Sequence, residues 1–160
     1  MVRRKEAKIT ALLVVGVTLV LCFLNVPFSE VGIMKGCAFA SRLVYHFFHA
    51  SLLHWFANAW CLLSLFFIYN MSLRELTTAF VASSLVPLSM LPELPTVGLS
   101  GICFFLMGRI ALSVRRKLYY QAWLAVYLAL GFLFPNSNGW LHLYCYLIGL
   151  FIGFLNMPLR

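Results

Sequence analysis

Apolar runs, broken only by short polar stretches, fill almost the whole of this sequence. Hydrophobic residues make up 63% of its 160 residues, and charged residues only 10%. A water-soluble domain of this length cannot hide so much apolar surface in one core. The sequence therefore predicts an all-α membrane protein. Because no Ser-, Pro- or charge-rich linker divides the chain, we expect a single membrane domain over residues 1–160.

Six of the runs approach the roughly 20 residues that a helix needs to cross a bilayer. The predicted spans cover residues 9–25, 44–69, 76–91, 97–114, 118–134 and 140–157. The first follows a basic N-terminal segment and also resembles a signal peptide. We expect it to be retained, because the Ala-Phe-Ala triplet at 38–40 lies too far beyond the run to serve as its cleavage site.

Lys and Arg residues gather in alternate connections between these spans. One set of loops and termini carries Arg3, Arg4, Lys5, Lys8, Arg74, Arg115, Arg116, Lys117 and Arg160. Only Lys35 and Arg42 fall on the opposite side. Positively charged loops stay in the cytoplasm, so both termini are predicted to be cytoplasmic, and the loops at 26–43, 92–96 and 135–139 to face outward. Arg109, near the cytoplasmic end of the fourth span, is expected to snorkel to the interface.

The same charges explain the formal net charge of +8 without a nucleic-acid partner. Basic clusters that bind RNA or single-stranded DNA are interleaved with aromatic stacking surfaces, and here they adjoin apolar runs instead. The expected partner is therefore the lipid bilayer, and no nucleic acid is expected.

Four polar side chains of the second predicted span, at His46, His49, His54 and Asn58, are costly in a bilayer. His54 and Asn58 lie one helical turn apart and project from nearly the same face. They can address one small site together, or they can bond neighbouring helices. A metal site at these histidines is disfavoured, because the span contains no carboxylate and the chain has no His-Glu-x-x-His motif.

Ser100 opens the fourth predicted span between Gly98 and Gly101, just after two prolines. At a helix N-terminus, unpaired backbone N–H groups and the positive end of the helix dipole face the position where an oxyanion would form. The flanking glycines also leave room for an approaching peptide. The alternative is that this Gly-x-Ser-Gly pattern is a surface for close helix packing.

His142 lies near the outer end of the sixth predicted span. Gly149 and Gly153 follow seven and eleven residues later, which returns them to the face of the histidine. This face can press closely on a partner helix, although a single histidine near a helix end is also typical of the membrane interface. At 1.5 Å per residue, Ser100 and His142 are expected at a similar depth below the outer surface.

A serine hydroxyl needs a base within hydrogen-bond reach, and histidine is the usual one near neutral pH. The sequence has no Asp, and its four Glu residues are terminal or in loops. An acidic third member is therefore excluded, and so is an aspartyl protease. An aromatic ring such as that of Trp140, Tyr144 or Tyr146 is expected to orient the imidazole instead.

The order, spacing and topology of these motifs resemble those of rhomboid proteases over residues 42–156. The motifs are the His-x-x-x-Asn pair, the Gly-x-Ser-Gly sequence, and the histidine followed by glycines. The resemblance implies a six-helix rhomboid-like bundle in which Ser100 and His142 form the catalytic dyad. His54, Asn58 and the Ser100 amide would form the oxyanion hole. It also implies a serine endopeptidase, without a cofactor, that cleaves single-span membrane proteins in or beside their transmembrane segment. Cys145 stands where many members of that family have glycine.

Two other functions stay open at this point. A catalytically inactive rhomboid-like protein would bind membrane clients without cutting them, although the joint presence of Ser100, His142, His54 and Asn58 argues against it. A small transporter or channel would need a carboxylate near mid-membrane, which the sequence lacks. The bare six-helix core without a transit peptide favours a bacterial plasma membrane, with secretory-pathway membranes as the alternative.

Overall fold

The computed structural model describes residues 2–133 and 137–156, and this part of the chain is helical. The long helices are α1 (Val2–Leu21), α4 (Leu52–Ile68), α5 (Leu73–Ser84), α6 (Ser100–Ile110), α7 (Lys117–Leu133) and α8 (Gly139–Leu155). Shorter helices are α2 (Phe28–Val31), α3 (Phe39–Val44), η1 (Tyr45–Phe47) and η2 (Leu88–Met90). Within the described ranges there is no β-strand, only one antiparallel bridge between Ile33 and Thr96. The predicted all-α class is confirmed.

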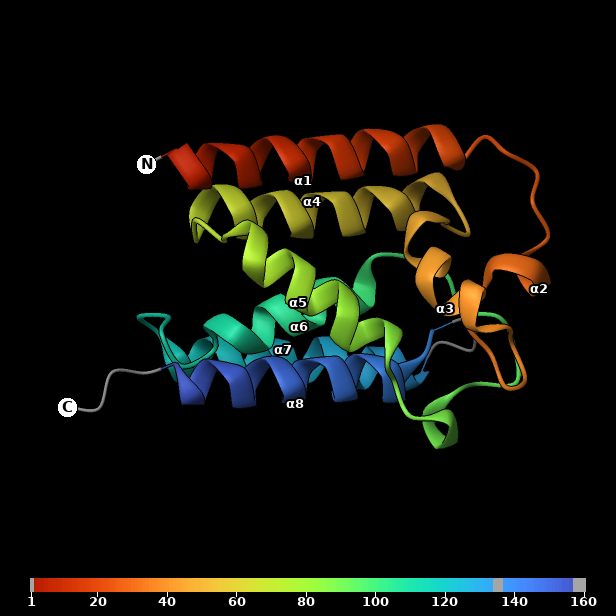
Figure 1. Cartoon of the computed structure of the whole chain (residues 1–160). Helices are drawn as coiled ribbons and strands as arrows, with labels where there is room; N and C mark the ends of the chain where they lie inside the picture. Colours follow the sequence, from red (N-terminus) through yellow and green to blue (C-terminus); the bar gives the residue numbers. More distant parts are fainter. Residues whose placement is uncertain (1, 134–136, 157–160) are drawn as a thin grey trace.

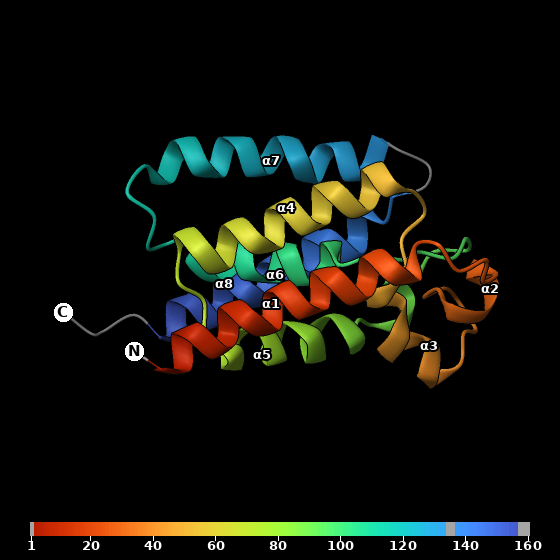
Figure 2. The ribbon, with the colours of Figure 1, turned by 90° about the horizontal axis from the view of Figure 1, so that it is seen from above.

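Helix α6 lies in the middle of the bundle, where it packs against α4, α5 and α8 (Figures 1 and 2). Most of its residues are buried. Helix α7 lies at one edge and packs chiefly on α8, and among its described residues Leu124 and Gly131 are the buried ones. Helix α6 is therefore largely buried at the centre of the bundle, whereas α7 is largely exposed at its edge.

The closest packing in the fold joins α6 to α8, and glycines make it possible. A Cβ built on Gly149 would overlap the carbonyl oxygen of Phe105, and one built on Gly108 would overlap that of Tyr146. Further along α8, a Cβ on Gly153 would lie 2.8 Å from the carbonyl oxygen of Arg109. Backbones approach this closely only where small residues line the contact. Gly149 and Gly153 thus fix the separation of the two helices.

The predicted helix over residues 44–69 is divided in the structure, and that boundary was wrong. The helical segment α3–η1 ends at Phe47, the chain is extended at Phe48, and α4 begins only at Leu52. Ser51 caps α4 because its side chain accepts a hydrogen bond from the His54 N–H at 3.1 Å. This break separates His46 and His49 from the helix that carries His54 and Asn58.

Other helix boundaries also differ from the predicted spans. Helix α5 ends at Ser84, before Pro87, because proline cannot continue the hydrogen-bonding ladder. Helix α6 begins at Ser100 rather than residue 97, since Gly98 has a φ of +121°, outside the helical region. The predicted ends of the last two spans, at residues 134 and 157, lie outside the described residues.

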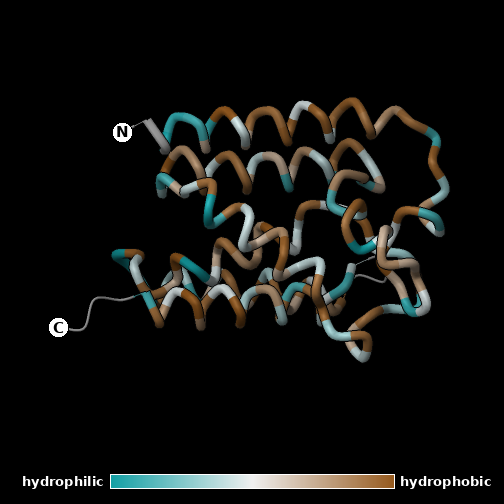
Figure 3. Tube along the Cα trace, viewed as in Figure 1, coloured by the Kyte–Doolittle hydropathy of each residue, from teal (hydrophilic) through white to brown (hydrophobic). Residues whose placement is uncertain are grey.

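Apolar residues run along the outer faces of the long helices, and hydrophilic residues gather at the helix ends and in the loops (Figure 3). Leu13 on α1, Leu118 on α7 and Phe151 on α8 are 63%, 88% and 59% exposed. Polar side chains such as Asn58 and His142 are buried instead. The bundle is therefore apolar outside and partly polar inside.

A helix needs roughly 20 mostly apolar residues to cross a bilayer. Over the described residues, none of the helices meets that requirement alone. The segments Phe39–Phe47 and Leu52–Ile68, which meet at 85°, satisfy it together by length and composition. Ser100–Ile110 and Gly139–Leu155 are apolar but shorter.

The α6–α8 contact generates a first prediction. Gly149→Ala should lower the free energy of unfolding by about 1–3 kcal/mol, because the added methyl group forces the two backbones apart. The matched control is Gly16→Ala, since nothing lies within 4 Å of a Cβ at Gly16 on α1. That control should be neutral or stabilise by up to about 1 kcal/mol through helix propensity. Equilibrium unfolding of the purified chain measures both, and equal stability of the two variants would contradict the packing argument.

Candidate active site

Ser100 and His142 meet where α6 and α8 begin. The Ser100 Oγ atom lies 2.9 Å from the His142 Nε2 atom. Ser100 is the first residue of α6, and His142 lies in the first turn of α8. The close glycine-lined contact between these helices brings the two side chains within hydrogen-bond distance. The structure thus joins two residues that are 42 positions apart in sequence.

Three helices start at this site. Helix α4 begins at Leu52 after its Ser51 cap, α6 begins at Ser100, and α8 begins at Gly139 after Asn138. The Asn138 side chain accepts a hydrogen bond from the Leu141 N–H at 3.0 Å, which fixes the start of α8 beside His142. Each N-terminus carries a partial positive charge and unpaired N–H groups. Their convergence favours a negative charge next to Ser100.

A second serine–histidine pair shows what distinguishes the first. His46 Nε2 lies 3.1 Å from the Ser84 Oγ atom, but His46 is 0% and Ser84 2% exposed. The Ser84 hydroxyl already donates its hydrogen to the Phe80 carbonyl oxygen at 2.8 Å. It can therefore only accept from His46, so that imidazole cannot act as its base. This pair is a structural bond between η1 and α5.

The Ser100 hydroxyl, by contrast, has no carbonyl acceptor among the described residues. Its hydrogen is free to be donated to His142 Nε2, which is the arrangement that general-base activation of a serine requires. His142 is buried, yet both residues line a cavity. The pair combines a serine hydroxyl that is free to donate with access for a reactant.

An aromatic ring orients the His142 imidazole, although not one that was predicted. Phe104 stacks on it with ring centroids 4.4 Å apart and an interplanar angle of 20°. Phe104 lies one turn after Ser100 on α6, so a single helix presents both the nucleophile and the support for its base. The i, i+4 spacing from Ser100 was a signal that the sequence analysis missed.

The aromatic rings that were predicted to orient His142 lie elsewhere. The Trp140 ring packs edge-to-face on Phe132, and the Tyr146 hydroxyl donates to the Gln121 side-chain oxygen at 2.5 Å. Neither of these rings, nor that of Tyr144, contacts the His142 imidazole in the described part of the chain. The expectation failed because the stacking residue comes from the facing helix α6 rather than from α8 itself.

The remaining ring nitrogen of His142 points at α7. A Cβ built on Gly131 would lie 2.9 Å from His142 Nδ1, so only glycine leaves room for the ring there. Within the described residues, Nδ1 has no hydrogen-bond partner. No carboxylate therefore completes a triad among them, in keeping with a two-residue dyad.

His54 and Asn58 flank Gly98, just before the serine. A Cβ on Gly98 would lie 3.0 Å from the His54 Nε2 atom and 3.4 Å from the Asn58 Nδ2 atom. Asn58 Nδ2 donates one hydrogen to the His54 carbonyl oxygen at 3.1 Å, which leaves its second hydrogen available. Both side chains line the cavity together with Ser100. Polar groups from α4 therefore gather beside Gly98, two residues before Ser100.

Tyr45 holds the loop before Ser100 in place, and the sequence analysis missed it. Its carbonyl oxygen accepts the Gly98 N–H at 2.9 Å, and its hydroxyl donates to the Ser83 carbonyl oxygen at 3.1 Å. Gly101 packs in the same corner, where a Cβ would lie 3.3 Å from the Tyr45 hydroxyl and 3.5 Å from the Cys145 sulfur. Cys145 thus packs against Gly101.

The cavity has a volume of about 940 Å³ and runs from the dyad along α4, α6 and α7. Its polar end contains Ser100, His142, His54 and Asn58. The rest is lined mainly by apolar and aromatic side chains, including Trp60, Cys61, Phe104, Met107, Trp123 and Tyr127. Such a volume is typical of sites that bind organic ligands.

His49 is the remaining imidazole near the site. Its ring lies 5.2 Å from that of His54, and neither of its nitrogens has a partner among the described residues. Over the described chain, no group of three or more His, Cys, Asp or Glu side chains is close enough to hold a metal ion. The neighbour of the His49 ring is thus the His54 ring, on which it packs edge-to-face.

Comparison with known proteins adds no relative. No family model matches the chain, and no match is found among curated proteins or solved structures.

The stacking contact generates a second prediction. Phe104→Leu should slow the labelling of the chain by a fluorophosphonate about two- to tenfold, because an aromatic pair of this kind contributes about 0.5–1.5 kcal/mol. Phe151→Leu on the outer face of α8 is the control and should keep the wild-type rate. Labelling rates measured under pseudo-first-order conditions decide the question, and an unchanged rate for Phe104→Leu would show that the stack does not orient the base.

Proposed function

We propose that this protein is an intramembrane serine endopeptidase of the rhomboid type, with Ser100 as nucleophile and His142 as general base. The observation that carries the proposal is the 2.9 Å contact between Ser100 Oγ and His142 Nε2 at the polar end of a large apolar cavity. No cofactor is needed for this chemistry.

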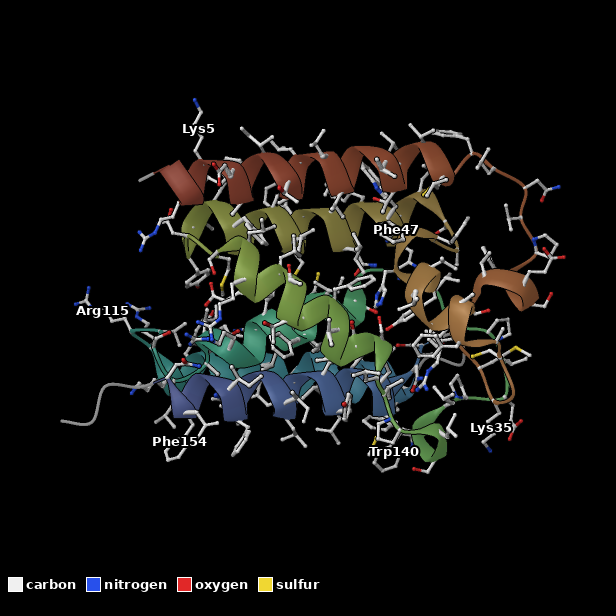
Figure 4. All side chains as sticks on the ribbon, viewed as in Figure 1. Lys5, Lys35, Phe47, Arg115, Trp140 and Phe154 are labelled. Carbon is white, nitrogen blue, oxygen red and sulfur yellow. The ribbon has the colours of Figure 1, made fainter. Side chains whose placement is uncertain are left out.

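The distribution of polarity supports a place in the bilayer. Large apolar side chains cover the outside, whereas polar side chains such as His46, Asn58 and His142 are buried. Water-soluble bundles rarely expose apolar patches of this extent. Lys5 and Arg115 lie at one end of the bundle, and Lys35 and Trp140 lie at the other (Figure 4). The richly basic end would be cytoplasmic, and the dyad would face the outer leaflet.

The geometry suits acyl transfer. The Ser100 oxygen attacks the carbonyl carbon of a peptide bond, and its proton passes to His142 Nε2. The negative charge on the former carbonyl oxygen is stabilised by the Ser100 N–H, the Asn58 amide and the His54 ring, near three helix N-termini. His142 then donates the proton to the leaving amine, which breaks the C–N bond and leaves an acyl-enzyme. Water, deprotonated by His142, then attacks the acyl carbon, and His142 returns this proton to the Ser100 oxygen as the ester bond breaks and the acid leaves.

The shape of the cavity supports a membrane-protein substrate. Its apolar length lies between α4 and α7, and α7 packs chiefly on α8. An apolar segment of a single-span protein can occupy this space without exposing its side chains to water. The polar end then receives the unwound portion that contains the scissile bond.

The dyad generates a third prediction. Ser100→Ala should abolish cleavage of a panel of single-span proteins on co-expression, because it removes the hydroxyl that lies 2.9 Å from His142 Nε2. Ser84→Ala is the matched control: it removes the serine of the buried pair and should retain cleavage wherever the variant folds. Immunoblotting of the clipped substrates measures both. Cleavage that persists in Ser100→Ala would refute the proposal, whereas a folded wild type that cuts nothing would favour an inactive client-binding protein.

The oxyanion donors generate a fourth prediction. Asn58→Ala should lower kcat by about 100-fold with little change in KM, because the amide contacts an oxygen charge that exists only in the transition state. Initial rates on a purified substrate in detergent micelles separate the two constants. A rise in KM at unchanged kcat would instead assign Asn58 to substrate binding.

A further inference from the structure

A second cavity lies at the opposite end of the bundle from the dyad. It has a volume of about 390 Å³ and is enclosed by α5, α6 and α8. Its polar lining consists of Ser72, Arg74, Glu75, Thr78, Arg109 and Asn156. This volume is many times the roughly 30 Å³ that one water molecule occupies, so a group of several atoms fits. The proposed proteolysis makes no use of this cavity.

Glu75 supplies the one carboxylate among the residues that line the cavity, and both of its oxygens already have partners. Glu75 Oε2 accepts hydrogen bonds from the Ser72 N–H at 2.8 Å and the Ser72 hydroxyl at 2.9 Å, which forms a capping box at the start of α5. The other oxygen, Oε1, lies 3.4 Å from Arg109 Nε. Glu75 therefore offsets one positive charge and has no free oxygen for a cation.

The guanidinium groups of Arg109 and Arg74 have N–H groups without a hydrogen-bond partner among the described residues. Arg109 is expected from the sequence to snorkel, but its side chain is about three-quarters buried, at 24% exposed, and reaches Glu75 through Nε. Its two terminal nitrogens make no hydrogen bond to any residue in the described ranges. Arg74 is exposed at the rim, and among the described residues it forms no ion pair. Two guanidinium groups thus face the cavity against one carboxylate, and an anion is the complementary ligand.

The surroundings favour a lipid over a free anion. Lys5 and Arg115 lie at this same end, so the potential around the cavity is positive (Figure 4). Apolar side chains adjoin the cavity: Ile152 lines it, and Leu155, in the same last turn of α8, is exposed. A ligand with a phosphate and apolar tails matches both features. Arginine binds phosphate through two parallel N–H bonds, and basic pockets between helices on the cytoplasmic side suit anionic headgroups.

We propose that this cavity binds the phosphate of an anionic phospholipid from the cytoplasmic leaflet, held by Arg109 and Arg74, with the acyl chains along the outer face of α8. The proposal rests on the membrane placement given under the proposed function, but not on the dyad. The lipid phosphate would pair with the charges of Arg74 and Arg109, which take no part in the proposed proteolysis.

Native mass spectrometry of the full chain tests it. Wild type released from mixed micelles should retain phosphatidylglycerol at least about tenfold more than phosphatidylcholine, because the choline cation offsets the phosphate charge of the latter and is repelled by the two guanidinium groups. Arg109→Gln and Arg74→Gln should each remove most of this preference. Arg115→Gln, which removes the same charge at the same end but does not line the cavity, should keep it. Equal retention of both lipids, or an unchanged preference in Arg109→Gln, would overturn the proposal.

Glu75→Gln separates a lipid site from a purely structural ion pair. Glutamine still completes the capping box, so α5 stays capped while the competing charge is removed. The proposal predicts undiminished or stronger retention of phosphatidylglycerol, whereas a structural role for Arg109 predicts the same loss as in Arg109→Gln. Displacement of the lipid by millimolar inorganic phosphate would assign the site to free phosphate and reject the lipid.

Proteolysis measured in the same preparations keeps the two proposals apart. In the wild type, equal retention of the two lipids with intact substrate cleavage would overturn only the lipid site, and a lipid preference without cleavage would overturn only the protease. Thermal unfolding of each variant shows which ones fold, and Arg74→Gln, at an exposed position, keeps the test open if Arg109→Gln does not.

Discussion

The backbone contact between α6 and α8 is the constraint on which the site depends. Gly108 and Gly149 let the two helices touch through their main chains, with no side chain between them. Two helices at this separation bring residues from their first turns within hydrogen-bond distance, and Ser100 and His142 occupy those turns. The geometry of the dyad is thus a consequence of helix packing. It does not require a third polar residue to pull the imidazole into place, because Phe104 and Gly131 bound the ring on two sides.

The two ends of the bundle carry different kinds of polar groups. At one end, three helix N-termini converge on Ser100 beside neutral polar side chains, which suits a transient negative charge. At the other end lie Arg74, Arg109 and Glu75, where permanent charges meet. Between them the core is apolar. The proposed place in a bilayer accommodates this order, since the charges would then remain near the interfaces and the Ser100–His142 pair would lie below the outer one.

The residues at the centre of the candidate site were identifiable from sequence because each is costly in an apolar helix. Ser100, His142, His54 and Asn58 stood out against their surroundings, and the glycines at 149 and 153 indicated a close contact, which the structure places against α6. What sequence periodicity did not reveal came from tertiary contacts. The helix break before Leu52 depends on the Ser51 cap, and the Tyr45 bond to Gly98 joins segments 53 residues apart. Phe104 on α6 and Gly131 on α7 lie against His142 on α8, and only the folded arrangement shows these contacts.

The central claim is that the Ser100 hydroxyl is activated by His142 in a pocket that a reactant can enter. The most direct measurement is the location of a fluorophosphonate adduct by peptide mapping of the folded chain. One phosphonyl group on Ser100 in the wild type, and none in His142→Gln under the same conditions, is the predicted result. An adduct on another serine, or no adduct on a folded wild-type chain, would contradict the account.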